Sequence, residues 1–451
     1  MTDVIVIGGG AAGWAAALAA AQEGATVVLV EKLAESGGSS ALSGGCLAFA
    51  GTDLQAAADI EDSPDALFAD LREVGQDVND AALVRTYCDE QLEAYSWLGQ
   101  AGVRFSPVIE TASGQSVPRA HTVDPADMVR ALKAAALATG RVDYRPNTAA
   151  LALEESADRP IPAVRLADGS IAEAGRGVVI ASGGFAKNPE MLMQYAPGYA
   201  EAVFVAGAGS QGDGLRMGLA LGADLRDMDY VKGTFGKHPT DETNDHSLQA
   251  VYKGAIAVNQ DGQRFVDESI SYKLLGDAVM AQPWHTAYQI MDQGIFDTGD
   301  DRVRILDFGR RLEEGLFYVG DSLEELARQI EIEPAVLVAT VQRYNGYVDA
   351  GHDPEFGRTC LVHRHGRLRR IETAPFYAYP STAVVFGTYC GLRIDSHARV
   401  LRADGSAISG LFAAGEVTGG FHGAAYMTGS ALGKAVVFGR IAGREAAAAA
   451  A

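Results

Sequence analysis

Two short apolar runs near the start of the chain give its first predicted elements. Val4–Ile7 is one continuous apolar run, and Thr26–Val30 is the second. An alanine-rich segment that begins at Trp14 lies between them, and alanine is the residue that favours a helix most. The pattern therefore predicts a strand, a helix and a second strand.

Three glycines mark the turn between the first strand and the helix. Gly8, Gly10 and Gly13 follow the spacing GxGxxG, and Glu31 ends the second strand. Glycines permit a tight turn and the close approach of a pyrophosphate to a helix N-terminus, and the later carboxylate can hold ribose hydroxyls. A strand, turn, helix, strand and acid in this order predict a bound dinucleotide.

The rest of the pattern divides the chain into three segments. We predict helices up to about Gly102 and over 124–139, and short strands over 149–155, 163–166 and 177–180. From about residue 232 to 386 the chain has more aromatic residues, histidines and irregular loops. Strands return after residue 387, and a last helix begins near Ser430. We predict a nucleotide-binding domain in two parts, 1–231 and 387–451, with an inserted domain over 232–386.

Composition excludes several classes of protein. The net charge of -21 argues against partners that are polyanions, so we expect neither nucleic acid nor an anionic membrane. The four cysteines form neither CxxC nor CxxCH, which argues against a covalent haem, an iron-sulfur cluster or another metal site. The apolar start lacks a basic segment before it, so it does not read as a signal peptide. We expect a cytoplasmic enzyme.

Six ordered motifs resemble one family across almost the whole chain. They are GGGAAG at 8–13, GGSSALSGG at 37–45, ASGGF at 181–185, GSQGDG at 209–214, DGQRFVDE at 261–268 and GLFAAGEVTGGFHG at 410–423. Together they resemble the flavoproteins related to soluble fumarate reductase and 3-ketosteroid 1-dehydrogenase. The resemblance implies an α/β fold, in which a Rossmann-like FAD-binding domain is interrupted by an α+β capping domain. It also implies hydride transfer between a substrate carbon and the flavin.

The resemblance assigns a set of residues to the cofactor. Glu31 is expected at the adenosine ribose, and Glu416 resembles the family acid at the ribityl chain. The start of the last helix would point its positive end at the flavin pyrimidine ring. The predicted set is Gly8, Gly10, Ala12, Gly13, Glu31, Lys32, Gly38, Ser39, Ser40, Ser43, Gly44, Gly45, Ala150, Ser182, Gly183, Gly184, Asp213, Glu416, Ser430, Ala431 and Leu432. Family members with covalent flavin attach it through a histidine before the second glycine pair. No histidine precedes His121, so the FAD is predicted to be non-covalent.

Three positions distinguish this chain from the fumarate-type reductases. Those enzymes use an arginine after the RFVDE-like motif, an arginine before the final helix and a histidine before the TxxG stretch. The matching positions here are Tyr272, Tyr426 and Gly387. Because a phenol cannot hold a carboxylate with two charged hydrogen bonds, neither succinate nor fumarate is an expected substrate.

Tyrosines at two of these positions resemble those of the ketosteroid dehydrogenases. RFxxESxxY in that enzyme resembles Arg264–Tyr272, and GTCGGL resembles Gly387–Leu392. The resemblance implies that the Tyr426 hydroxyl and the Gly429 amide bind a ketone oxygen and stabilise the enolate. Tyr272 would then take the α-proton, which requires its pKa to fall from the usual value of about 10.

These assignments predict an FAD-dependent dehydrogenase, an oxidoreductase that acts on CH–CH groups and introduces a C=C bond α,β to a ketone, with a cyclic ketone expected. The alternative is a fumarate-reductase-like reductase of an activated C=C bond, in which His238 of the KHPT segment positions the substrate. A flavin carrier without catalytic activity is a third hypothesis. Arg119 and His121 are expected to pair with nearby acids rather than to bind substrate. Because no haem motif is present, oxygen, a quinone or a redox protein must serve as external electron acceptor.

Overall fold

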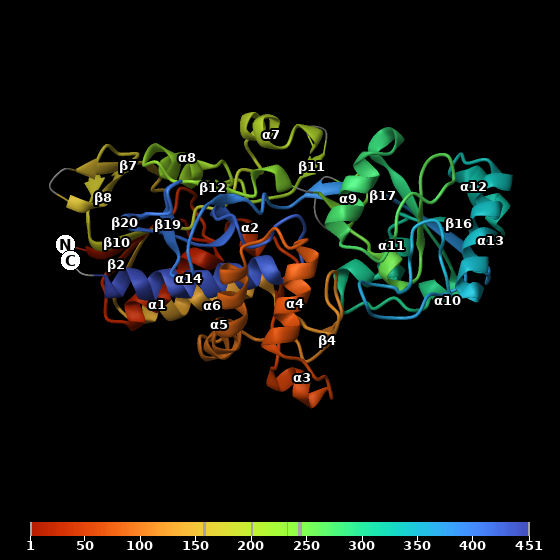
Figure 1. The fold of residues 1–451 in the computed structure, drawn as a ribbon, viewed down its shortest axis with the longest axis horizontal. Coiled ribbons are helices and arrows are strands. Elements are labelled where there is room, and N and C mark those ends of the chain that lie inside the picture. Colours follow the sequence, from red (N-terminus) through yellow and green to blue (C-terminus); the bar gives the residue numbers. More distant parts are fainter. Residues whose placement is uncertain (1, 157–158, 200–201, 232, 242–245, 450–451) are drawn as a thin grey trace.

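The computed structural model describes all residues except 1, 157–158, 200–201, 232, 242–245 and 450–451. Figure 1 shows two parts side by side, one built on a parallel sheet and one built around strand β17 (Phe376–Val385). Residue 232, where the predicted insertion begins, and residue 451 lie outside the described residues.

A six-stranded sheet forms the centre of the first part. Its strands are β1 (Thr2–Ile7), β2 (Val27–Val30), β6 (Val142–Arg145), β10 (Ala174–Ile180), β19 (Arg399–Leu401) and β20 (Ala407–Ala413). Their order is β19-β20-β10-β1-β2-β6, and every pair is parallel except β19 with β20. The register pairs Ile7 with both Val30 and Ile180, so these strands end together at one edge. Ligands of open parallel sheets bind at this carboxyl edge.

Helices cover one face of this sheet and a small antiparallel sheet covers the other. The helices are α1 (Ala11–Gln22), α6 (Pro125–Ala138) and α14 (Ser430–Ala448), which pack against one another or the strands (Figure 1). The small sheet consists of β7 (Ala150–Ser156), β8 (Arg159–Leu166) and β9 (Ile171–Ala172), and β8 contacts β10 and β20. The predicted strands and helices of this part are confirmed.

The second part has a mainly antiparallel sheet and several helices, as predicted for an α+β cap. The strands are β11 (Val203–Phe204), β13 (Thr234–Lys237), β14 (Ile256–Val258), β15 (Ala287–Asp292), β16 (Tyr318–Gly320) and β17. The helices are α9 (Tyr272–Met280), α10 (Gln293–Phe296), α11 (Phe308–Glu313), α12 (Leu323–Gln329) and α13 (Pro334–Ala350). β11 precedes residue 232 in the sequence, yet it pairs with β17. A separate cluster of buried apolar side chains gives this part a core of its own.

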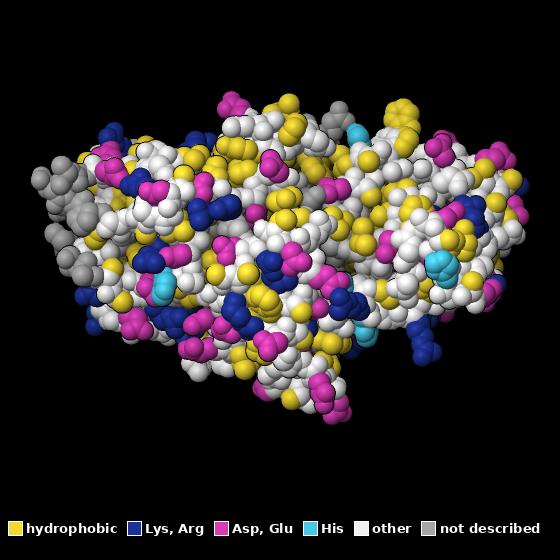
Figure 2. Space-filling model, in the orientation of Figure 1, with side chains coloured by type: hydrophobic (Ala, Val, Ile, Leu, Met, Phe, Trp, Pro, Cys, Tyr) yellow, Lys and Arg dark blue, Asp and Glu magenta, His cyan; other side chains and the backbone are white. Residues whose placement is uncertain are grey.

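Shorter elements connect and flank the two parts. They are α2 (Gly38–Ala41), β3 (Cys46–Ala48), α3 (Asp53–Ala57), α4 (Pro64–Val74), α5 (Ala81–Gln100), β4 (Ile109–Glu110), β5 (Ala120–Thr122), α7 (Pro189–Tyr195), α8 (Asp213–Ala220), β12 (Leu225–Arg226) and β18 (Gly391–Leu392). Among the described residues, no helix combines the length and apolar character that a bilayer crossing requires. Figure 2 shows side chains of both charges dispersed over the visible face.

Candidate functional site

One cavity of about 1410 Å³ follows the carboxyl edge of the parallel sheet and continues to the second part. Ile7, Val30 and Ala181 line it from the strand ends, and Tyr272 and Tyr426 line it as well. Pockets for a single ligand usually measure roughly 300–1,000 Å³. This cavity therefore has room for a large cofactor together with a substrate.

Most of the residues predicted to bind the cofactor line this cavity. They are Gly8, Gly10, Ala12, Glu31, Lys32, Gly38, Ser39, Ser40, Ser43, Gly44, Gly45, Ala150, Ser182, Gly183, Asp213, Glu416, Ala431 and Leu432. Gly13, Gly184 and Ser430 are not among the lining residues. A Cβ on Gly13 would lie 1.8 Å from the carbonyl oxygen of Gly8, so this glycine allows α1 to pack on the end of β1. Its role in the structure is close packing beneath the cavity.

The end of the cavity near β2 offers a carboxylate and backbone amides. The two oxygens of Glu31 accept hydrogen bonds from the amides of Gly9 and Leu33, at 2.8 and 2.9 Å. A carboxylate has about four acceptor positions, so capacity for ribose hydroxyls remains. Helix α1 begins beside it, and Ser40 Oγ accepts the amide N–H of Ala11 at 3.1 Å. The next amides of the first turn have no acceptor within the helix, which suits an anionic pyrophosphate. This donor set fits the adenosine and pyrophosphate of FAD.

The other end of the cavity is closed by the start of α14. Ala431 and Leu432 line the cavity, and the preceding Gly429 has a φ of +88° and provides no side-chain cap. The positive end of the helix dipole therefore faces the cavity, where it favours a negatively charged group. Glu416 is buried nearby and accepts the amide N–H of Thr388 at 2.9 Å. Burial raises the pKa of Glu416, although amide hydrogen bonds oppose the shift.

Two phenols, one from each part, meet at this end. The rings of Tyr272, at the start of α9, and Tyr426, in the loop before α14, have centroids 5.8 Å apart. The Thr428 hydroxyl donates to the Tyr272 oxygen at 2.8 Å, and the Gly429 amide donates to the Tyr426 oxygen at 3.0 Å. The prediction had this amide bind a ketone directly. In the structure the amide bonds the phenol instead.

The electrostatic environment keeps both phenols protonated. Burial, together with Tyr426 and Tyr389, raises the pKa of Tyr272 well above its usual value. Burial also raises the pKa of Tyr426 to about 12, against hydrogen bonds from the Gly429 amide and Tyr272 that lower it. The pKa of Tyr272 thus moves opposite to the fall that the sequence-based mechanism requires, because burial outweighs the favourable hydrogen bond from Thr428.

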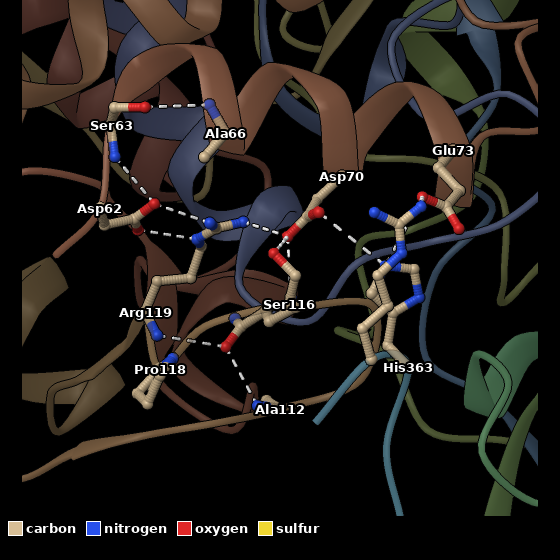
Figure 3. Close-up of polar contacts among 12 residues, drawn as sticks. Asp62, Ser63, Ala66, Asp70, Glu73, Ala112, Ser116, Pro118, Arg119 and His363 are labelled. Atoms are coloured by element: carbon tan, nitrogen blue, oxygen red, sulfur yellow. Dashed lines mark hydrogen bonds and ion pairs between the residues drawn. The ribbon is translucent and has the colours of Figure 1, made fainter. Parts of the chain in front are cut away.

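Arg119 lies between Asp62 and Asp70 and fixes the loop that also holds Ala112 and Ser116 (Figure 3). The Arg119 guanidinium is fully buried and lies 2.7 Å from Asp62 and 2.5 Å from Asp70. Burial alone would raise the pKa of Asp70, but His363, Arg119 and Ser116 lower it to about 2. Arg119 thus pairs with acids, as predicted.

The same loop contacts the segments that carry Tyr272 and Tyr426, through the backbone and the hydroxyl of Ser113. Ser113 Oγ accepts the amide N–H of Tyr272 at 3.1 Å, and its carbonyl oxygen accepts the amide N–H of Thr428 at 2.9 Å. Ser113 Oγ also lies 3.1 Å from the Tyr252 hydroxyl, which donates its own hydrogen to the Ile270 carbonyl oxygen at 2.8 Å. The loop therefore connects α9 of the second part with the segment before α14.

Two predicted histidine assignments differ from the structure. His238 is buried but is not among the described residues that line the cavity, and its Nδ1 lies 2.9 Å from Thr240 Oγ1. Burial and His246 lower the pKa of His238 to about 4. His121 does not pair with an acid. Its ring nitrogens contact Thr52 Oγ1 and the Arg119 carbonyl oxygen, because the buried ring on β5 packs among the rings of Phe49, Tyr95 and Phe105.

Comparisons with known proteins agree with this geometry. Residues 3–432 match the FAD binding domain family. The chain belongs to this family of flavoproteins. The flavoprotein is 34% identical over 456 residues to a fumarate reductase (cytochrome) of Shewanella frigidimarina. The match covers 99% of this chain and 77% of the relative. It is 32% identical over 465 residues to a urocanate reductase of Eggerthella lenta, with 99% and 75% covered.

Among solved structures, the flavoprotein resembles the 3-ketosteroid-delta4-(5alpha)-dehydrogenase of Rhodococcus jostii. The TM-score is 0.80 at 26% identity, and the match covers 99% of this chain and 96% of that one. Membership of the family establishes that the protein binds FAD and that it is an FAD-dependent oxidoreductase acting on CH–CH groups, because its relatives are reductases and dehydrogenases of C=C bonds.

Several residues of the flavoprotein site were missed from the sequence. Tyr389 and His422 line the cavity, and the Tyr389 ring lies 4.9 Å from Tyr426. Lys273 is buried with its Nζ 4.4 Å from the Tyr389 ring, and burial lowers its pKa to about 7. Tyr389 and His422 stand inside motifs that the resemblance already singled out, so motif position was a usable signal. For Lys273 the neighbouring Tyr272 was the only signal.

Proposed function

We propose that this flavoprotein is a dehydrogenase that introduces a C=C bond α,β to the carbonyl of a ketone, with cyclic ketones as the substrate class. The observation that carries the proposal is the Tyr272 and Tyr426 pair in the cavity. Phenols can polarise a ketone and exchange a proton with its α-carbon, whereas neither can hold a dicarboxylate as two guanidiniums would. The likeness to a ketosteroid dehydrogenase structure supports the same chemistry.

Each residue has a defined task in this mechanism. Bound FAD supplies a two-electron acceptor for the β-hydrogen as hydride. The Tyr426 hydroxyl donates a hydrogen bond to the ketone oxygen, and the Gly429 amide steadies the phenol oxygen at 3.0 Å. Donors aimed at a developing enolate oxygen stabilise the transition state. Tyr272 removes the α-proton in its minor phenolate form, whose oxygen accepts a hydrogen bond from the Thr428 hydroxyl, and the neutral phenol then holds that proton. His238 lies outside the cavity lining and has no task in these steps.

A second candidate runs the reaction in the opposite direction. Because burial keeps Tyr272 protonated, this phenol is equipped to donate a proton to the α-carbon while a reduced flavin delivers hydride. The function would then be reduction of a C=C bond activated by a ketone. The same residues serve both directions, so direction depends on which partner exchanges electrons with the flavin.

Anaerobic mixing of the oxidised holoenzyme with saturated cyclic ketones tests the first direction. Bleaching of the visible flavin absorbance, with formation of the α,β-unsaturated ketone, is the expected result. If saturated ketones leave the flavin oxidised, while enones reoxidise chemically reduced enzyme, the second candidate is the correct one. Failure of both reactions would refute the ketone chemistry altogether.

The proposal includes an external electron acceptor, which is oxygen, a quinone or a redox protein, and a cytoplasmic location. It also includes non-covalent FAD, since the stretch Gly38–Ser43 contains no histidine. Acid precipitation of the holoenzyme should release all of the flavin into the supernatant. Yellow colour or flavin fluorescence that stays with the denatured chain would contradict this part of the proposal.

A further inference from the structure

Tyr389 is a third phenol at the reactive end of the cavity, and it has no task in the steps described above. Its ring lines the cavity and lies 4.9 Å from the Tyr426 ring, and the His422 ring meets it edge-on at 5.3 Å. Within the described part of the chain, the Tyr389 hydroxyl has no hydrogen-bond partner. Phenol hydroxyls inside proteins usually find a partner, so this donor is directed at a group that the cavity takes up.

The backbone holds Tyr389 in a conformation that residues with a side chain rarely adopt. Its φ is +56°, in the left-handed region that favours glycine. Strained residues of this kind cluster at catalytic and ligand-binding sites, where the surrounding structure holds them in place. The conformation of Tyr389 is therefore consistent with a role in binding a ligand.

Two neighbours fix the position of the Tyr389 ring. The ammonium group of the buried Lys273 lies 4.4 Å from its centroid, a distance at which a cation attracts an aromatic face. A Cβ on Gly387 would lie 3.6 Å from Tyr389 Cζ, so the hydroxyl-bearing end of the ring lies beside Gly387. Gly387 is the position that matches the reductases' histidine. The phenol thus brings a polar group to the part of the cavity wall where this chain lacks that histidine.

The donor that the sequence-based mechanism placed beside Tyr426 is already engaged. The Gly429 amide N–H donates to the Tyr426 oxygen at 3.0 Å, so it does not reach a ketone directly. The Tyr272 hydroxyl is engaged with Thr428 and Tyr426. Burial, Tyr426 and Glu416 raise the pKa of Tyr389 well above its usual value, so this phenol keeps its proton near neutral pH. Tyr389 is therefore equipped to donate a hydrogen bond rather than to act as a base.

We propose that the Tyr389 hydroxyl is a second donor to the carbonyl oxygen of the ketone, beside the Tyr426 hydroxyl. This inference rests on the proposed function and adds a catalytic residue to it. Donors that point at a developing oxyanion stabilise the transition state more than the ground-state ketone. Tyr272 remains the group that exchanges the α-proton. The oxyanion site then consists of two phenols, one from the loop after β17 and one from the loop before α14.

Two ring ligands that do not reduce flavin separate an oxyanion contact from ring packing. 4-Cyanophenol, ionised at a pH above its own pKa, presents an oxyanion that imitates the enolate, and benzonitrile has the same ring and nitrile without that oxygen. Binding to the oxidised holoenzyme is measured from the change in the visible flavin spectrum. Tyr389→Phe removes only the hydroxyl. It should weaken the binding of 4-cyanophenolate about tenfold and leave the affinity for benzonitrile unchanged.

Tyr344→Phe is the matched control. Tyr344 is a buried phenol whose hydroxyl also has no partner among the described residues, and its ring faces the guanidinium of Arg264 at 5.2 Å. It is not among the described residues that line the cavity, so this variant should bind both ligands as the unmodified enzyme does.

Three results would each overturn the proposal. Equal losses for both ligands in Tyr389→Phe would show that the residue only packs against the ring. Unchanged binding of 4-cyanophenolate in this variant would show that the hydroxyl does not contact the oxyanion. Equal binding of the two ligands by the unmodified enzyme would show that the cavity has no oxyanion site. Because neither ligand transfers hydride, the donor role of Tyr389 and the desaturation reaction can fail independently.

Discussion

Removing one hydroxyl group, in the variant Tyr426→Phe, tests the central step of the proposed reaction. The ring volume is retained, so the aromatic contacts with Tyr272 and Tyr389 remain. What is lost is the donor to the ketone oxygen and the acceptor of the Gly429 amide hydrogen bond. Loss of one donor to a developing oxyanion lowers a rate by about 10²–10³. The Gly429 N–H, left without a partner, costs about 1–3 kcal/mol of stability.

The assay is anaerobic stopped-flow reduction of the bound flavin by saturating cyclic ketone, together with urea unfolding of the same samples. The control variant Tyr379→Phe removes a buried phenol hydroxyl that donates to the His246 carbonyl oxygen, away from the cavity. It should lose comparable stability and keep its rate of flavin reduction. The double variant Tyr272→Phe/Tyr426→Phe should lose less than the sum of the two single losses, because hydrogen bonding couples the side chains. A rate in Tyr426→Phe within threefold of the unmodified enzyme, or an equal loss in Tyr379→Phe, would refute the assigned role.

Three further predictions follow from the same contacts. Because burial holds the pKa of Tyr272 well above its usual value, the phenolate fraction and the rate of flavin reduction should rise steadily between about pH 6 and 9, and a plateau near neutrality would contradict this. Gly13→Ala, which places a Cβ 1.8 Å from the Gly8 carbonyl oxygen, should yield protein with little bound flavin by absorbance ratio. Gly99→Ala in α5, where an added Cβ meets no atom within 4 Å, should keep its flavin. Arg119→Met leaves two buried aspartates without their cation and should lower the free energy of unfolding by about 3–5 kcal/mol in urea. A loss below about 1 kcal/mol, the size expected for an exposed ion pair, would show that this cation is not required.

The nucleotide-binding half was predictable because its signals are local. The apolar runs, the glycine spacing and Glu31 all lie within one strand-helix-strand unit. Each of these signals indicates the local structure without reference to distant residues. The cavity collects these residues where the strands end. Most of the predicted cofactor set therefore lines one cavity, and its contacts with FAD stay a prediction.

The second part was less predictable because its sheet joins distant segments. β11 at Val203–Phe204 pairs with residues 384–385, and the local sequence of either segment does not predict which strand it pairs with. The motif resemblance did bring the two phenols together. The rise in the pKa of Tyr272 could not be read from the sequence, because burial is a property of the folded molecule that one sequence motif does not reveal.

The two phenols belong to different halves of the molecule. Tyr272 begins α9, which packs on β13 and β17, and Tyr426 lies in the strand-to-helix loop that carries the start of α14. A displacement of α9 would move Tyr272 away from Tyr426 and break its hydrogen bond with the Thr428 hydroxyl. The proposed proton transfer and carbonyl contact therefore both depend on the same junction between the two parts, because one phenol comes from each side of it.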